Sequence, residues 1–186
     1  MTLMKETIKE ISNFIQKQRI GTVVGLDGYS GLGKTTISNQ LEIINSNIKV
    51  VHMDDYVTTS NTKENLEPQL ENNADELKLE WTDVKRGGFI ALVEDIKKYT
   101  DKIILVEGIF LSHSDVLPGI FNQMVFLDGD EELADKRRIV REKERWGDEY
   151  FPETHPDSFV RLFKLAWQRY KELYCPEEKA NLVVSV

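Results

Sequence analysis

The chain has 186 residues, of which 40% are hydrophobic and 30% are charged, as in ordinary soluble globular proteins. This length fits one domain with a full hydrophobic core. The formal net charge of -8 at pH 7 argues against nucleic acid or an anionic membrane as a partner. The single cysteine, Cys175, excludes an intrachain disulfide, and no apolar run is long enough to span a bilayer, so we expect a cytoplasmic protein.

The first two elements are predicted from hydrophobic patterning. Apolar residues recur at helical spacing at the start of the chain, which predicts a helix over about residues 3–18. This segment lacks the continuous apolar core of a signal peptide. The β-branched run that follows predicts a buried strand over residues 20–27.

A glycine-rich loop follows this strand and matches the phosphate-binding pattern G-x-x-x-x-G-K-[ST]. Its glycines let backbone N–H groups point at a phosphate, and the helix predicted to about residue 46 adds its positive end. We expect Lys34 to reach the β- and γ-phosphates of ATP and the Thr35 hydroxyl to ligate Mg²⁺. A ligand-free turn is the alternative, but it would not need Lys-Thr after its last glycine. The expected ATP-binding residues are Gly28, Tyr29, Ser30, Gly31, Leu32, Gly33, Lys34, Thr35 and Thr36.

A second strand is predicted at Asn47 to Met53, and Asp54 and Asp55 follow it directly. A carboxylate at a strand end could accept the proton of an attacking hydroxyl and help to order Mg²⁺. Asp54 is therefore the candidate catalytic base, a substrate-binding residue and a metal ligand, with Asp55 secondary. The alternative is a turn-forming or helix-capping aspartate.

A polar stretch from Thr58 to Glu80 separates this strand from the next predicted helix, at about Thr82 to Tyr99. A loop this long inside a compact domain is usually functional. We therefore expect an acceptor-binding segment over about residues 55–85, with Tyr56, Trp81 and Asp83 as substrate-binding candidates. Core packing is an equal alternative for the Trp81 ring.

Two further strands are predicted, at Lys102 to Glu107 and at Gln123 to Asp128. An acidic residue at the end of a hydrophobic strand is where phosphate-loop proteins hold their metal, so Glu107 is a candidate metal ligand. A solvated turn carboxylate is the alternative. Asp130 is better interpreted as the N-cap of the next helix. The histidines His52, His113 and His155 lack metal-ligand spacing, so surface or core positions are expected for them.

A basic helix is predicted over about residues 131–145, within a lid of about 131–152. Arg137 and Arg141, with Arg145, fall at i, i+4 spacing on one face and could stabilise charge on a transferring phosphoryl group. The alternative is a solvated helix with pairs such as Arg138 with Glu142. A helix at about 156–174 and a strand at Ala180 to Val186 complete the chain.

Strands that alternate with helices, each strand a continuous apolar run, predict a parallel sheet covered on both faces. Ligands bind such sheets beyond the carboxyl ends of the strands. The phosphate loop, Asp54, Glu107 and the basic helix all follow strand ends, so the sequence predicts one site at that rim.

The chain resembles the uridine kinase and phosphoribulokinase family of P-loop kinases, whose related members phosphorylate nicotinamide riboside and pantothenate. The resemblance rests on Gly28 to Thr36, His52 to Tyr56, Val106 to Gly108, Arg137 to Glu142 and Ala180 to Val184. It implies an α/β, three-layer P-loop NTPase fold with a five-stranded parallel sheet flanked by helices and a helical lid. By position it implies Asp54 as catalytic base, Lys34 at the phosphates, Thr35 and Glu107 at the metal, and Arg137 and Arg141 in the lid.

Two segments depart from the family pattern. Arg145-Trp146-Gly147-Asp148 stands where the family's lid usually has Arg-Gly-Arg. Glu80-Trp81-Thr82-Asp83 stands where uridine kinases have His-Pro-Asp after an aromatic residue. These departures leave the acceptor open.

We therefore expect one kinase domain over residues 1–186 that uses ATP and Mg²⁺ to phosphorylate a hydroxyl of a nucleoside such as uridine or a related ribosyl compound. The alternatives are a kinase for a non-nucleoside such as pantothenate or a sugar, and a nucleotide-binding switch or sensor ATPase without an acceptor. A nucleic-acid-directed NTPase is disfavoured by the acidic charge. The assembly state, including a homo-oligomer, stays open.

Overall fold

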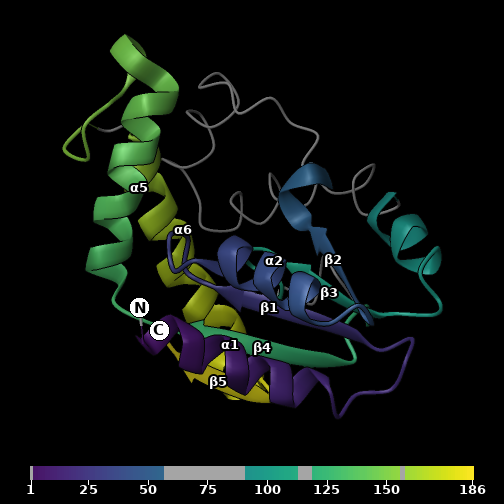
Figure 1. Cartoon of the computed structure of the whole chain (residues 1–186). Coiled ribbons are helices and arrows are strands. Elements are labelled where there is room, and N and C mark those ends of the chain that lie inside the picture. Colours follow the sequence, from purple (N-terminus) through teal and green to yellow (C-terminus); the bar gives the residue numbers. More distant parts are fainter. Residues whose placement is uncertain (1, 57–90, 113–118, 156–157) are drawn as a thin grey trace.

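The computed structural model describes residues 2–56, 91–112, 119–155 and 158–186. In this part of the chain one sheet of parallel strands has the order β2-β3-β1-β4-β5, which puts the strand before the phosphate loop at its centre (Figure 1). This confirms the expected α/β fold. The strands are β1 (Val23–Gly28), β2 (Ile48–His52), β3 (Ile103–Glu107), β4 (Gln123–Asp128) and β5 (Leu182–Ser185).

The strand register brings the expected site residues to the same level. Glu107, the last residue of β3, pairs with Leu26 of β1 on one side and with His52, the last residue of β2, on the other. Because the strands are parallel, their carboxyl ends share one edge of the sheet. The phosphate loop and the turn that carries Asp54 both leave the sheet from that edge.

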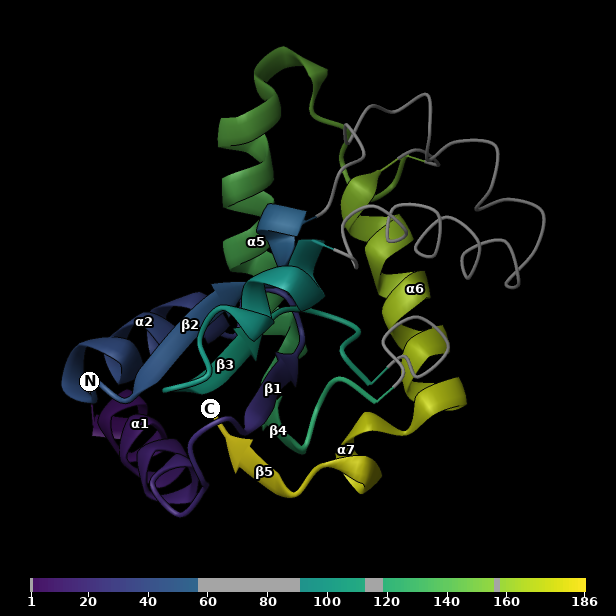
Figure 2. The same ribbon diagram turned by 90° about the vertical axis from the view of Figure 1, so that its right-hand side faces the viewer.

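Helices cover both faces of the sheet. The helices α1 (Thr2–Ile15) and α2 (Lys34–Ile44) lie on one face, and α6 (Phe159–Tyr174) lies on the other (Figure 2). Residues 91–97 are also helical. Alternate strand residues point to opposite faces, so that Leu26 and Leu105 lie toward α2 while Phe126 stacks on Trp167 of α6.

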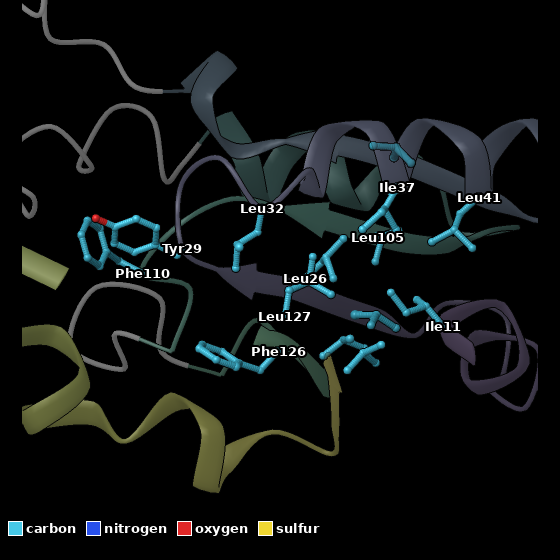
Figure 3. Packing of buried hydrophobic residues seen from close by; sticks show 14 of the residues in the cluster. Ile11, Leu26, Tyr29, Leu32, Ile37, Leu41, Leu105, Phe110, Phe126 and Leu127 are labelled. Carbon is cyan, nitrogen blue, oxygen red and sulfur yellow. The ribbon is translucent and has the colours of Figure 1, made fainter. Parts of the chain in front are cut away.

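The buried side chains form two clusters. In the larger one Leu26 and Leu105 of the sheet meet Ile37 and Leu41 of α2 (Figure 3). In the other, Ile104 and Val106 pack against Leu92. Each fully buried side chain of this size contributes about 1.5–3 kcal/mol, so these clusters fix the sheet and the loops that leave it.

The helix α5 (Glu131–Trp146) begins directly after β4 and projects from the loop edge of the sheet (Figure 1). Its N-cap is Asp130, whose side chain accepts a hydrogen bond from the backbone N–H of Leu133 at 3.0 Å, as expected. A 3-10 turn (Gly147–Glu149) follows it. The described helices include none that is both long and apolar enough to cross a membrane.

The elements differ from the sequence prediction at several ends and by one additional helix. The first strand starts at Val23 rather than at residue 20, because Gly21 has a positive φ of 86°, which a strand does not allow. The Gly21 N–H donates instead to the backbone oxygen of Lys102. A short helix, α7 (Pro176–Lys179), was not predicted. Proline at the first helical position needs no hydrogen-bond partner for its nitrogen and so favours such a start.

Candidate active site

The phosphate loop is held in shape by close contact with α5. Gly31 has a φ of +96°, and a Cβ at this position would lie 2.7 Å from the backbone oxygen of Ala134. The loop therefore needs glycine there. Gly33, with a φ of +93°, precedes α2 and offers no side-chain cap. The first N–H groups of α2 therefore face the loop, where an anion would be stabilised.

The side chains of the loop divide into two groups. Tyr29 and Leu32 are buried in the core, so these two can offer a phosphate only their backbone. Ser30 is partly exposed, and Thr35 and Thr36 are exposed at the start of α2. The structure thus brings all nine expected ATP-binding residues into one loop and helix start, but it turns two of their side chains away from a ligand.

Lys34 is buried and folds back onto the loop. Its Nζ atom donates hydrogen bonds to the backbone oxygens of Gly28 at 2.7 Å and Tyr29 at 2.8 Å. Burial lowers the pKa of Lys34 to about 8, although nearby carboxylates, Asp27 first among them, oppose the shift. These two bonds use two of the three N–H donors of the ammonium group.

Thr35 and Glu107 meet at the edge of the sheet. The Thr35 hydroxyl donates to Oε1 of Glu107 at 3.0 Å, and Glu107 is buried with 6% of its surface exposed. Nδ1 of His52 lies 2.7 Å from the same carboxylate oxygen. His52 was not predicted from the sequence to make this contact. Its place one residue before Met53-Asp54, at a strand end, was the available signal.

Asp54 lies on the 3-10 turn Met53–Tyr56 and is exposed. Desolvation by the surrounding rim, together with the Glu107 carboxylate, raises its pKa, while Lys34 and Arg141 act in the opposite direction. Asp54 follows His52, the last residue of β2, by two positions, and therefore lies at the same edge of the sheet as Glu107. A carboxylate with a raised pKa is a better proton acceptor.

Tyr56, an expected substrate-binding residue, has its hydroxyl engaged with another group. It donates to Oδ2 of Asp95 at 2.5 Å, and its ring packs beside the second hydrophobic cluster. In this structure Tyr56 links the Asp54 turn to the helix at residues 91–97. Trp81, Asp83 and the rest of the expected acceptor segment from residue 57 onward lie outside the described residues.

Two exposed arginines of α5 contact the phosphate loop. Nη1 of Arg137 donates to the backbone oxygen of Gly31 at 3.3 Å, and Nη2 of Arg141 donates to Oγ of Ser30 at 3.2 Å. For Arg145, expected on the same face, the guanidinium carbon instead lies 5.3 Å from the centre of the Trp146 ring. Arg137 and Arg141, the two arginines that the resemblance implies for the lid, thus both contact the loop.

The alternative of a solvated α5 face carrying Arg138 and Glu142 is wrong. Each of these residues has 2% of its surface exposed, and the Arg138 guanidinium carbon lies 3.6 Å from the centre of the Phe163 ring of α6. Burial lowers the pKa of Arg138 to about 10, against the favourable charge of Glu142. This charged face of α5 is therefore packed against α6.

A buried carboxylate beneath the loop was not predicted. Asp27 has no exposed surface and accepts hydrogen bonds from the backbone N–H of Gly28 at 2.8 Å and from the hydroxyl of Tyr170. Burial raises its pKa, and these hydrogen bonds and Lys34 oppose the shift. An acidic residue inside an apolar strand, next to the loop, was the available signal.

The donor atoms at the rim suit Mg²⁺. Among the described side chains, no group of three or more His, Cys, Asp or Glu residues is arranged to hold a metal ion. Mg²⁺ in phosphoryl-transfer sites needs no such cage, because it takes one or two carboxylates and completes its shell with phosphates and water. The Thr35 hydroxyl and the carboxylates of Glu107 and Asp54 offer oxygen atoms of the required kind.

Comparison with known proteins places this arrangement in context. No protein-family model matches the chain. A curated uridine kinase from Limosilactobacillus reuteri is 27% identical over 91% of this chain and 89% of its own length. The chain resembles uridine kinases.

Solved structures share the fold. A structure described as a possible uridine kinase from Bacillus stearothermophilus has a TM-score of 0.54 and 21% identity, and the match covers 97% of this chain and 98% of that one. A candidate fructose transport system kinase from a Silicibacter species has a TM-score of 0.55 and 18% identity over 98% of both chains. The fold is therefore that of uridine kinase-like P-loop kinases.

Proposed function

We propose that this chain is a kinase that uses ATP and Mg²⁺ to phosphorylate a hydroxyl of a nucleoside such as uridine, or of a related ribosyl compound. The observation that carries the proposal is the contact between the phosphate-loop hydroxyl of Thr35 and the strand-end carboxylate of Glu107, at 3.0 Å. The similarity to uridine kinases over most of the chain supports a kinase as the reaction type.

In the proposed reaction the acceptor hydroxyl oxygen attacks the γ-phosphorus, the bond to the bridging oxygen of ADP breaks, and Asp54 takes the hydroxyl proton. The loop amides and Lys34 hold the phosphates, while Arg137 and Arg141 neutralise charge that builds up on the transferring group. When bound, Mg²⁺ supplies further charge neutralisation, and Thr35, Glu107 and Asp54 are the residues that would hold it. The positions of these side chains at one edge of the sheet support this assignment.

The choice of a nucleoside as the phosphate acceptor is the most specific part of the proposal. The fold is shared with a candidate fructose transport system kinase, so the fold does not select an acceptor. The relative that is 27% identical is named for uridine, which favours a nucleoside. Pantothenate and sugars remain the second class of acceptor.

The test is ADP release from Mg-ATP with uridine, cytidine, nicotinamide riboside, pantothenate, fructose and other sugars, using the wild-type chain. Lys34→Met serves as the blank, because it lacks the ammonium group that reaches the phosphates. We expect acceptor-dependent turnover with a nucleoside that the blank does not show. Tight ATP binding with no stimulation by any acceptor would contradict the proposal and favour a nucleotide-binding switch.

A further inference from the structure

A chain of polar contacts joins the phosphate loop to α5 and α6. The hydroxyl of Tyr29, the second residue of the loop, donates to Oδ1 of Asp135 on α5 at 2.7 Å. The other oxygen of Asp135, Oδ2, lies 2.9 Å from Nζ of Lys164 on α6, which also donates to Glu153 at 2.5 Å. Tyr29 is 2% exposed and Asp135 is 7% exposed, so this contact lies inside the protein.

The Tyr29 ring is fixed by aromatic neighbours from α6. Its centre lies 5.1 Å from that of Phe163 and 5.3 Å from that of Trp167, both in edge-on geometry. Figure 3 shows Tyr29 at the loop end of the buried cluster, which also contains Phe110. Packing therefore aims the hydroxyl at Asp135. Burial, and after it the Asp135 carboxylate, raises the pKa of Tyr29, so the hydroxyl is a donor at neutral pH.

The helix α5 carries two neighbouring stripes of residues, one in contact with the phosphate loop and one in contact with α6. Ala134, Arg137 and Arg141 contact the phosphate loop, as the close approach of Gly31 to Ala134 and the two arginine hydrogen bonds show. The neighbouring stripe consists of the buried residues Asp135, Arg138 and Glu142, which lie toward α6. Both stripes have i, i+3, i+7 spacing on one rigid helix, so fixing the rotation of one stripe fixes the other.

We propose that Tyr29 and Asp135 are positioning residues, whose hydrogen bond sets the rotation of α5 and thereby holds Arg137 and Arg141 over the phosphate loop. The donor of this bond, Tyr29, is itself a loop residue, one position before Ser30. A residue of the phosphate loop thus orients α5, the helix whose arginines contact that loop. This inference rests on the proposed function, because the arginines act on the phosphates of ATP. Neither residue touches the reacting atoms.

The first arm of the test is hydrogen exchange of peptides that cover residues 131–146, measured without nucleotide. Tyr29→Phe removes only the hydroxyl, and we expect exchange in α5 to become about threefold to tenfold faster, as one lost buried hydrogen bond allows. Tyr56→Phe is the matched control, since it removes a hydroxyl bonded to Asp95, and α5 should then exchange as in the wild type. Equal exchange in Tyr29→Phe and wild type overturns the proposal. This arm needs no turnover, so it stands even if the chain transfers no phosphate.

The second arm separates positioning from general stability. We expect Tyr29→Phe to lower acceptor-dependent turnover about threefold to tenfold in the wild type but to have a smaller effect in Arg141→Ala, because part of its action goes through the Arg141 guanidinium that this variant lacks. Asp135→Asn keeps an acceptor for the tyrosine and should retain most of the turnover that Asp135→Ala loses. Additive losses in the double variant, or equal losses in Asp135→Asn and Asp135→Ala, contradict the positioning role.

Discussion

The hydroxyl of Thr35, at the first turn of α2, donates a 3.0 Å hydrogen bond to the carboxylate of Glu107, 72 residues further along the chain. This bond joins the helix that follows the phosphate loop to the end of β3. It also brings together two of the oxygen donors that we assign to Mg²⁺.

Thr35→Ser keeps the hydroxyl and should retain kinase activity, whereas Thr35→Val removes it at nearly constant volume. We expect Thr35→Val to lose on the order of a hundredfold or more in turnover, because a ligand to the metal and a partner of Glu107 disappear together. The measurement is acceptor-dependent ADP release at saturating Mg-ATP. Equal activity in the two variants would remove Thr35 from the metal site.

His52→Ala should raise the Mg²⁺ concentration needed for half-maximal turnover about tenfold, since Nδ1 of His52 lies 2.7 Å from the Glu107 oxygen and orients that carboxylate. Thermal unfolding without Mg²⁺ provides the control for a merely structural effect. The orienting role fails if the Mg²⁺ titration of the variant coincides with that of the wild type.

Lys34 should make the stability of the ligand-free protein depend on pH. Burial lowers its pKa from the ordinary value of 10.5 to about 8 in the folded protein, so the unfolded state binds more protons between these two pH values. The unfolding free energy of the wild type should therefore rise with pH relative to Lys34→Met, by on the order of 1–3 kcal/mol. Urea denaturation of both proteins from pH 7.5 to 10 measures the difference. If the difference in unfolding free energy between the two proteins does not change with pH, burial does not lower the pKa of Lys34.

Tyr170→Phe should destabilise the protein by about 1–3 kcal/mol, because two buried hydrogen bonds are lost. The Tyr170 hydroxyl donates to the buried Asp27 carboxylate and accepts from the backbone N–H of Ser112 at 2.8 Å. Tyr150→Phe, at a half-buried tyrosine, should change stability by less than about 0.5 kcal/mol. Equal urea midpoints for the two variants would contradict this account of Asp27.

The features that were predictable from sequence have local causes. Each strand is a short apolar run, the phosphate loop is set by its glycines and Lys34, and Asp130 caps α5 through a contact three residues away. The carboxylates at the strand ends follow from the same pattern, because parallel strands end at one edge. The same pattern predicts Asp54 and Glu107 at the edge from which the phosphate loop leaves the sheet.

The features that were missed depend on contacts between distant segments. Hydrophobic periodicity cannot reveal the buried face of α5, because that face is made of Asp135, Arg138 and Glu142 rather than apolar residues. The bond between Tyr29 and Asp135 joins positions 106 residues apart. The boundaries of a lid at about 131–152 and of an acceptor segment at about 55–85 remain predictions.

The most direct test of the account is phosphate transfer by Asp54→Asn, compared with Asp55→Asn on the same exposed turn. Both variants lose one negative charge, but only the first loses the proposed base. We expect Asp54→Asn to bind ATP as the wild type does and to lose on the order of a hundredfold or more in acceptor phosphorylation, while Asp55→Asn stays near wild type. Acceptor phosphorylation at the wild-type rate in Asp54→Asn would contradict the central claim that this carboxylate is the base of a kinase.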